Sequence, residues 1–453
     1  MRLKNTEIDM LNGPLFGKIM RFGIPLILTN VLQLLFNAAD IAVAGRFAGE
    51  ESLAAVGATG SLVFLVINIL IGISVGVNVV VARYYGMGSK SDSLSRAVHT
   101  AIFVAIFGGI IFAIIGFSIS GLMLKAISVP NNIYPLSLLY MRIFFLGLPF
   151  NMLYNYGTAI LRARGDTTRP FFYLLISGTT NVILNLIFVI VFHLGVAGVA
   201  IATDLSNMLS AFLILRFLMK SEDELHVDLR KIKMDWAMFR SMARIGVPAG
   251  LQSSMFSISN AVIQSAINSY GPMVMAASSA ASSIENFVYI GMNAFHQAAQ
   301  TFISQNIAAE KKERVGKILK VCLLCTTLVG GVLCIIELLF APFFMSLYNT
   351  NAEVISIGVS RMYVIVIPYL IFGYGDVLVG AIRGHGISLP PVIINLLATC
   401  VLRILWIYFL DVPRVDVLYV FMSYPITWTA LLIALVVYWF HIRRSKEYGI
   451  PKK

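Results

Sequence analysis

The sequence predicts an all-α membrane protein with twelve transmembrane helices, arranged as two six-helix lobes related by a pseudo-twofold axis. Three observations support this fold class: the composition, a series of apolar stretches and an internal repeat. The chain has 453 residues, of which 58% are hydrophobic and only 12% are charged, and its mean hydropathy is +0.85. Soluble domains carry about 25% charged residues, so most of this chain must lie in lipid.

Apolar stretches long enough to cross a bilayer, which takes about 20 helical residues, recur along the whole chain. They are continuously apolar and do not alternate in short pieces, which favours helices over the strands of a barrel. They begin near Phe16, Leu53, Ala97, Tyr134, Pro170, Val196, Ser241, Val274, Lys317, Val354, Ser388 and Asp416.

The placement of the basic residues predicts the orientation in the membrane. The chain has 34 Lys and Arg and a formal net charge of +12. Only Arg46, Lys125 and Arg414 lie in the odd-numbered connections, whereas the N-terminal arm, the even-numbered connections and the C-terminal tail hold most of the others. Basic residues concentrate on the cytoplasmic side. We therefore expect a multi-pass cell-membrane protein with both termini in the cytoplasm, and no nucleic-acid partner.

The longest polar stretch of the chain, residues 220–240, separates the first six apolar stretches from the last six. It predicts a cytoplasmic linker between an N-terminal six-helix lobe at 1–219 and a C-terminal six-helix lobe at 241–453, which ends in a short cytoplasmic tail.

Short motifs recur in the same order in both halves, which indicates an internal repeat. Residues 22–25 return at 245–248, 148–150 at 367–369, and Arg164-Gly165 at Arg383-Gly384. Because each repeat has an even number of spans, both copies enter from the same side, and their axis stands along the membrane normal. The recurring prolines within the spans predict either static kinks or hinges.

Polar residues at helical spacing in the first span predict an ion site. Thr29, Gln33, Asn37 and Asp40 share one helix face. A charged side chain in hydrocarbon costs at least about 2.5 kcal/mol, so Asp40 is expected to have a functional reason to be there.

The fifth and sixth spans bring further polar groups to the same depth. Asn181, Asn185 and Thr203 are expected at the level of Asp40, roughly 9–12 Å inside the outer boundary at 1.5 Å per residue. Their oxygens suit a proton or Na⁺. The alternative is that the three only hydrogen-bond helices together. Asp204 follows Thr203, and its role stays open.

The C-terminal half offers acids that either bind a cationic substrate or pair with a helix arginine such as Arg403. These are Glu285 near the bilayer middle and Asp376 nearer the cytoplasm; Glu337, near the outer end, is expected to snorkel. The candidates for substrate contact, for which core packing is the alternative, are Gln33, Tyr154, Met255, Asn260, Glu285 and Tyr289.

Four matching stretches give the sequence a resemblance to the multidrug and toxic compound extrusion (MATE) family. They read NAADIAVAG at 37–45, AAVG at 54–57, LRARGDTTRP at 161–170 and GVAGVAIAT at 195–203. The resemblance implies a V-shaped pair of six-helix lobes that export organic, often cationic, compounds in exchange for H⁺ or Na⁺. It implies that Asp40 is the principal coupling carboxylate.

The resemblance also implies that Asn181, Asn185 and Thr203 surround Asp40, as a possible Na⁺ site. This chain departs from the family pattern in two places: Asn185 stands where similar members commonly carry Asp, and the seventh span lacks the acid of the sodium-driven branch near Phe256. Both departures favour H⁺.

We therefore expect a monomeric antiporter that needs no cofactor besides the coupling ion, with ion coupling at Asp40, Asn37, Asn181, Asn185, Thr203 and Asp204. The nearest alternative is a flippase for a lipid-linked oligosaccharide, which would need a strongly cationic cleft for diphosphate. A passive channel is disfavoured by the repeat and the paired prolines. No set of residues in the apolar stretches suits a membrane-embedded enzyme, and the four cysteines, two of them at Cys-x-x-Cys spacing, predict packing roles without a metal.

Overall fold

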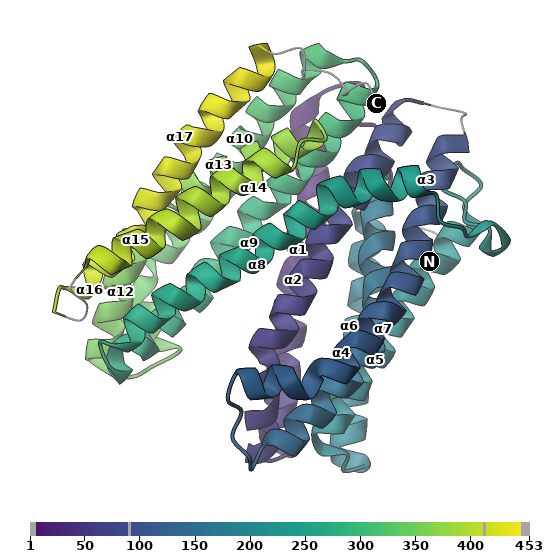
Figure 1. Ribbon diagram of the computed structural model, residues 1–453. Helices are drawn as coiled ribbons and strands as arrows, with labels where there is room; N and C mark the ends of the chain where they lie inside the picture. Colours follow the sequence, from purple (N-terminus) through teal and green to yellow (C-terminus); the bar gives the residue numbers. More distant parts are fainter. Residues whose placement is uncertain (1–5, 89–91, 411–413, 445–453) are drawn as a thin grey trace. The chain divides into compact units, whose positions relative to one another are not determined.

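The computed structural model describes residues 6–88, 92–410 and 414–444, and this part of the chain is built from helices without strands (Figure 1). The expected C-terminal tail at 445–453 lies outside it. The helices of the first half are α1 (Leu15–Phe47), α2 (Glu50–Gly86), α3 (Asp92–Phe103), α4 (Gly109–Ala126), α5 (Tyr134–Arg164), α6 (Thr168–Leu186) and α7 (Gly195–Lys220).

The second half follows the same order, with more breaks. Its helices are α8 (Trp236–Asn268), α9 (Pro272–Ala308), α10 (Lys312–Leu339), α11 (Ala341–Ser346), α12 (Ala352–Val366), α13 (Tyr369–Gly384), α14 (Leu389–Asn395), α15 (Leu402–Phe409), α16 (Val417–Phe421) and α17 (Ser423–Arg444). Three π-helical segments continue α3 into α4, extend α6 and join α14 to α15: Val104–Gly108, Ile187–Val191 and Leu396–Val401.

The expected all-α membrane fold is confirmed. In the described chain, nine helical segments are long and apolar enough to cross a membrane, and α12 with α13, bent by 45°, make a tenth if counted as one span. The two other expected spans are α8 and α9, of 33 and 37 residues. Both are long enough to cross a membrane, and both contain several serines and asparagines, which lower their hydropathy.

The described chain divides into two compact units. Of the described residues, unit 1 holds 6–8 and those of 28–250, and unit 2 holds 9–27 and those of 251–444. The expected linker at 220–240 therefore lies within unit 1, and the boundaries fall inside α1 and α8, just after Pro25 and Pro248. The reason is that the first part of α1 packs in unit 2, where Phe22 meets Phe302 edge-on at 5.5 Å between ring centroids.

The first part of α8 packs in unit 1 by the equivalent arrangement, through glycines on both helices. Gly72 and Gly76 on α2 face Gly246 and Gly250 on α8, and a methyl group added at Gly72, Gly76 or Gly246 would overlap backbone atoms of the other helix. Two small-xxx-small pairs thus let the helix backbones touch, which is how membrane helices approach most closely.

We expect Gly76→Ala to destabilise the protein by about 1–3 kcal/mol, because its new methyl group would overlap the Met242 carbonyl oxygen. Gly60→Ala, on the same helix with open space around it, should instead stabilise by up to about 1 kcal/mol through helix propensity. Thermal unfolding in detergent compares the two variants. Equal melting temperatures for both would show that the backbones do not touch there.

The motif at 161–170 forms the turn between α5 and α6. Gly165 ends α5 with a φ of 97°, a left-handed conformation that favours glycine. Arg164 forms ion pairs with Glu7 and Asp223, and Asp166 accepts a hydrogen bond of 2.8 Å from Thr6. The motif therefore ties both the N-terminal segment and the start of the linker to unit 1.

Candidate ion-binding site

Three of the predicted polar residues meet in unit 1 around the carboxylate of Asp40. The Asn185 Nδ2 atom donates to Asp40 Oδ1 at 2.5 Å, and the Thr203 hydroxyl lies 3.4 Å from Asp40 Oδ2. Asn181 links the other two, because its Nδ2 lies 3.4 Å from Thr203 Oγ1 and its Oδ1 accepts from Asn185 at 3.3 Å. One carboxylate is thus held by polar groups from two other helices.

The helices place these side chains by simple spacing. Asn181 and Asn185 lie one turn apart on α6 and are 5% and 0% exposed. The Thr203 hydroxyl also lies 3.0 Å from the Val199 carbonyl oxygen on α7, so its one proton is shared between that oxygen and Asp40. Directly after Leu186, α6 changes to a π-helical turn, a form that often occurs at functional sites.

Within the described part of the chain, only the nitrogen of the Asn185 carboxamide makes hydrogen bonds. Its Nδ2 serves both Asp40 and Asn181, whereas its Oδ1 is buried and has no hydrogen-bond partner among the described residues. An unsatisfied buried acceptor is costly, on the order of 1–3 kcal/mol. The site therefore contains an oxygen available to a proton donor or a cation.

Three other candidates do not join this cluster. Asn37 is exposed and Gln33 is half-buried on α1. The carboxylate of Asp204 lies against Gly147 on α5, so it turns away from the cluster that its neighbour Thr203 joins. Tyr140 on α5 was missed by sequence reasoning; it lies close enough to Asp40 and Asp204 for their charges to act on its hydroxyl. Because Tyr140 sits in an apolar stretch without a polar stripe, no spacing signal marks it.

The candidate acid Glu285 in unit 2 has a permanent cationic partner. Both its oxygens accept from Arg361, at 3.2 and 3.0 Å, and Arg361 also donates to Ser278 at 2.7 Å. Both charged side chains are buried. Of the two expected alternatives for Glu285, pairing with a helix arginine is the one observed, although the partner is Arg361 and not Arg403.

The other polar candidates of unit 2 are also engaged within it. Asp376 pairs with His296 at 3.0 Å and accepts from Asn293 at 3.2 Å. Arg403 donates to Asn260 at 3.3 Å. Asn293 also lies 3.4 Å from the Tyr289 hydroxyl.

Two further residues proposed for substrate contact are Tyr154 and Met255. Tyr154 is 6% exposed within the core of unit 1, which is the packing alternative. Met255 is half-buried on α8, where its carbonyl accepts from Cys400 at 3.4 Å.

The expectation that Glu337 snorkels is wrong. Its side chain is buried, and its Oε2 has no hydrogen-bond partner in the described part of the chain. The carboxyl group lies near enough to Glu285 to interact with its charge. Snorkelling requires the charged end to reach the water interface, and the α10 face that carries Glu337 is covered by protein.

A second carboxylate at position 185 should create a Na⁺ site. In Asn185→Asp, a second carboxyl group would replace the amide that now lies within hydrogen-bond distance of Asp40. Two carboxylates side by side provide the oxygen ligands that hard cations favour. At a Na⁺ concentration about 100 times its Kd, the variant should gain about 2.7 kcal/mol of stability. The measurement is the melting temperature in NaCl against KCl.

The matched control is Asn37→Asp, which adds the same charge at an exposed position on α1. An equal response of Asn185→Asp to both salts would contradict the predicted site, as would a Na⁺ response in the control of the same size.

Comparison with known proteins identifies relatives along nearly the whole chain. A family model described as MatE matches residues 25–187 and 248–409, one range in each half of the repeat. The chain is 27% identical over 434 residues to the "Probable multidrug resistance protein YoeA" of Bacillus subtilis (strain 168), covering 94% of both chains. It is 23% identical to the "Multidrug export protein MepA" of Staphylococcus aureus (strain MSSA476), over 83% of this chain and 82% of the relative.

Solved structures show the same fold. A structure described as the outward-facing conformation of a multidrug resistance MATE family transporter of the MOP superfamily has a TM-score of 0.89. It covers 96% of this chain and 98% of its own, at 20% sequence identity.

Proposed function

Because the chain belongs to the MatE family of multidrug efflux transporters, we propose that it exports small organic cations by antiport against H⁺, which binds at Asp40. The observation that carries this proposal is the arrangement around that carboxylate. Asp40 accepts from Asn185 and Thr203, and an unpaired Asn185 oxygen lies beside it. The site can therefore serve both the charged and the neutral form of one acid.

Each form of Asp40 needs different hydrogen bonds. The carboxylate accepts from the Asn185 Nδ2 and the Thr203 hydroxyl, as observed. When a proton binds, the new O–H becomes a donor, and the Asn185 carboxamide can turn its Oδ1 toward it. This exchange breaks a bond between α1 and α6 and replaces it with one of opposite direction, so the proton changes how the two helices are joined.

Coupling follows if the substrate and the proton favour different conformers. A ligand shifts a conformational equilibrium only by its difference in affinity for the two states. In the proposed cycle, the conformer with charged Asp40 accepts the organic cation from inside. Protonation from outside then favours the conformer that releases it.

Na⁺ is the alternative coupling ion and fits this donor set less well. It requires oxygen ligands, but the Asn185 and Asn181 Nδ2 atoms point at neighbouring oxygens in the cluster. Both carboxamides would have to turn to bind Na⁺, whereas a proton requires only one to turn. We further propose that the protein works as a monomer in the cell membrane with both termini in the cytoplasm.

The test is efflux of a fluorescent cationic dye from proteoliposomes in which pH and Na⁺ gradients are imposed separately. Efflux driven by the pH gradient without Na⁺, with the dye moving against its own gradient, is the expected result. Efflux driven only by the Na⁺ gradient would show that Na⁺, and not H⁺, is the coupling ion. Dye movement that always follows its own gradient would refute antiport.

A further inference from the structure

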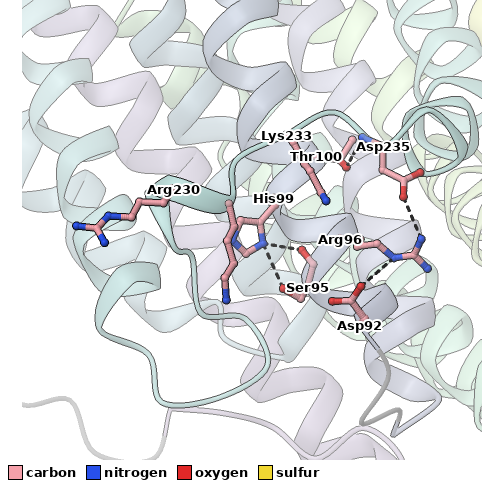
Figure 2. Close-up of a pocket in the computed structure, with 9 residues that line it drawn as sticks. Asp92, Ser95, Arg96, His99, Thr100, Arg230, Lys233 and Asp235 are labelled. Carbon is pink, nitrogen blue, oxygen red and sulfur yellow. Dashed lines mark hydrogen bonds and ion pairs between the residues drawn. The ribbon is translucent and has the colours of Figure 1, made fainter.

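A cavity of about 270 Å³ opens in unit 1 between α3 and residues 230–235, the end of the expected linker (Figure 2). It lies far in sequence from the Asp40 cluster and uses none of its residues. Its walls carry four cationic side chains and two carboxylates, those of Asp92 and Asp235. The cavity therefore has a surplus of positive charge.

Specific hydrogen bonds hold the linker against α3 and form the walls of the cavity. The backbone N–H of Asp228 donates to His99 Nε2 at 3.1 Å, and that of Asp235 donates to Thr100 Oγ1 at 3.2 Å. Because Nε2 accepts, the ring proton of His99 is on Nδ1, which lies 2.8 Å from the Ser95 carbonyl oxygen. His99 is thus neutral and fixed in orientation.

The two carboxylates are already occupied by one arginine. Arg96 lies 3.5 Å from Asp92 and 3.2 Å from Asp235 (Figure 2). Among the described residues, Arg230 and Lys233 have no acidic partner. Figure 2 shows Lys233 pointing inward toward Thr100 and Arg96, whereas Arg230 points away from the other labelled residues. A positive charge at the cavity is therefore left for an external anion.

Large apolar side chains flank the cationic residues on both sides in the sequence. Leu229 is 50% exposed and Trp236 is 71% exposed. Exposed tryptophan beside basic residues is typical of the level of the lipid headgroups, and basic clusters next to transmembrane helices on the cytoplasmic side attract anionic lipids. A free phosphate ion would have no use for these apolar neighbours.

We propose that this cavity binds the phosphate headgroup of an anionic phospholipid of the cytoplasmic leaflet. Lys233 supplies the charge inside the cavity, Arg230 adds positive charge at its edge, and Trp236 and Leu229 contact the lipid. The bound lipid then holds the linker on α3. In the membrane the site requires the cytoplasmic orientation proposed above; binding in detergent does not depend on it or on transport, so the two proposals fail separately.

The test measures the affinity of the purified full chain in detergent for phosphatidylglycerol and phosphatidylcholine by native mass spectrometry. Arg230→Gln with Lys233→Gln should weaken phosphatidylglycerol binding at least about tenfold, since each basic residue near an anionic lipid surface contributes about 1 kcal/mol. Phosphatidylcholine binding should not change. The matched control is Lys312→Gln with Lys317→Gln, which removes two exposed charges at the start of α10.

Two further arms identify the source of the phosphate. Trp236→Ala should weaken phosphatidylglycerol binding and leave inorganic phosphate binding unchanged. Displacement of the lipid by inorganic phosphate at equal concentration would overturn the lipid assignment in favour of a free anion. Equal loss in the control pair, or equal affinity for both lipids, would overturn the site.

Discussion

Replacing Asp40 with asparagine should abolish ion-driven efflux and leave the fold intact. Asparagine has the same shape, and its Oδ1 can still accept from Asn185 or Thr203, which now hold the carboxylate. The asparagine side chain cannot bind a proton at physiological pH, so the proton gradient can no longer change the protonation state of residue 40. We expect gradient-driven efflux to fall at least about 100-fold, which corresponds to a loss of roughly 2.7 kcal/mol of differential ion binding.

The measurement combines dye efflux from proteoliposomes with dye binding to the purified variant. The melting temperature should stay near the wild-type value, because asparagine keeps the shape of the side chain. Dye binding should weaken and lose its dependence on pH, because a neutral residue 40 stands in for the protonated acid that favours release. Asn37→Ala, one turn earlier on α1 and exposed, is the control and should keep efflux. Undiminished, uphill efflux by Asp40→Asn would exclude this carboxylate from coupling.

Arg361→Gln should be the most destabilising of these substitutions. It leaves the Glu285 carboxylate buried without its cationic partner. Removing one member of a buried ion pair costs about 3–5 kcal/mol, because the remaining charge is uncompensated. Arg361 also lies over the rings of Phe421 and Tyr424, at 5.2 and 5.5 Å. We expect poor expression and a strongly lowered melting temperature.

The pairing itself is tested by the double variant Arg361→Gln with Glu285→Gln. With neither charge of the pair left, the double variant should recover much of the lost stability. Arg142→Gln is the matched control, because Arg142 also lies within a span but is exposed over the Phe117 ring. A loss in Arg142→Gln as large as in Arg361→Gln would show that burial of the pair is not the cause.

The sequence was sufficient to predict the spans and the Asp40 cluster, for physical reasons. Continuous apolar stretches allow little besides membrane helices, and polar residues at helical spacing mark one face of each helix. Asn181, Asn185 and Thr203 could be placed near Asp40 because depth follows from distance to the helix end. The contacts in the structure agree with this placement, while the coupling role remains a prediction.

The partners of Glu285 and Glu337 could not be predicted in the same way. Spacing gives depth and face, but it does not give the rotation of one helix against another. Arg361 stands 76 residues from Glu285, and nothing in the spacing distinguishes it from another helix arginine such as Arg403. Glu337 was placed at an interface because it lies near a helix end, but neighbouring helices cover its face. The unit boundaries inside α1 and α8 were also hidden, because they depend on which helix the first turns pack against.

The glycine contact between α2 and α8 also limits how these two helices can move and which substitutions they can accept. The two backbones touch where glycines face each other. Turning either helix about its axis would bring larger side chains into the crossing, so the close contact holds the first part of α8 in one rotational setting on α2. For the same reason, a larger residue at Gly72, Gly76 or Gly246 would push the two backbones apart. We therefore expect these positions to be small in related sequences.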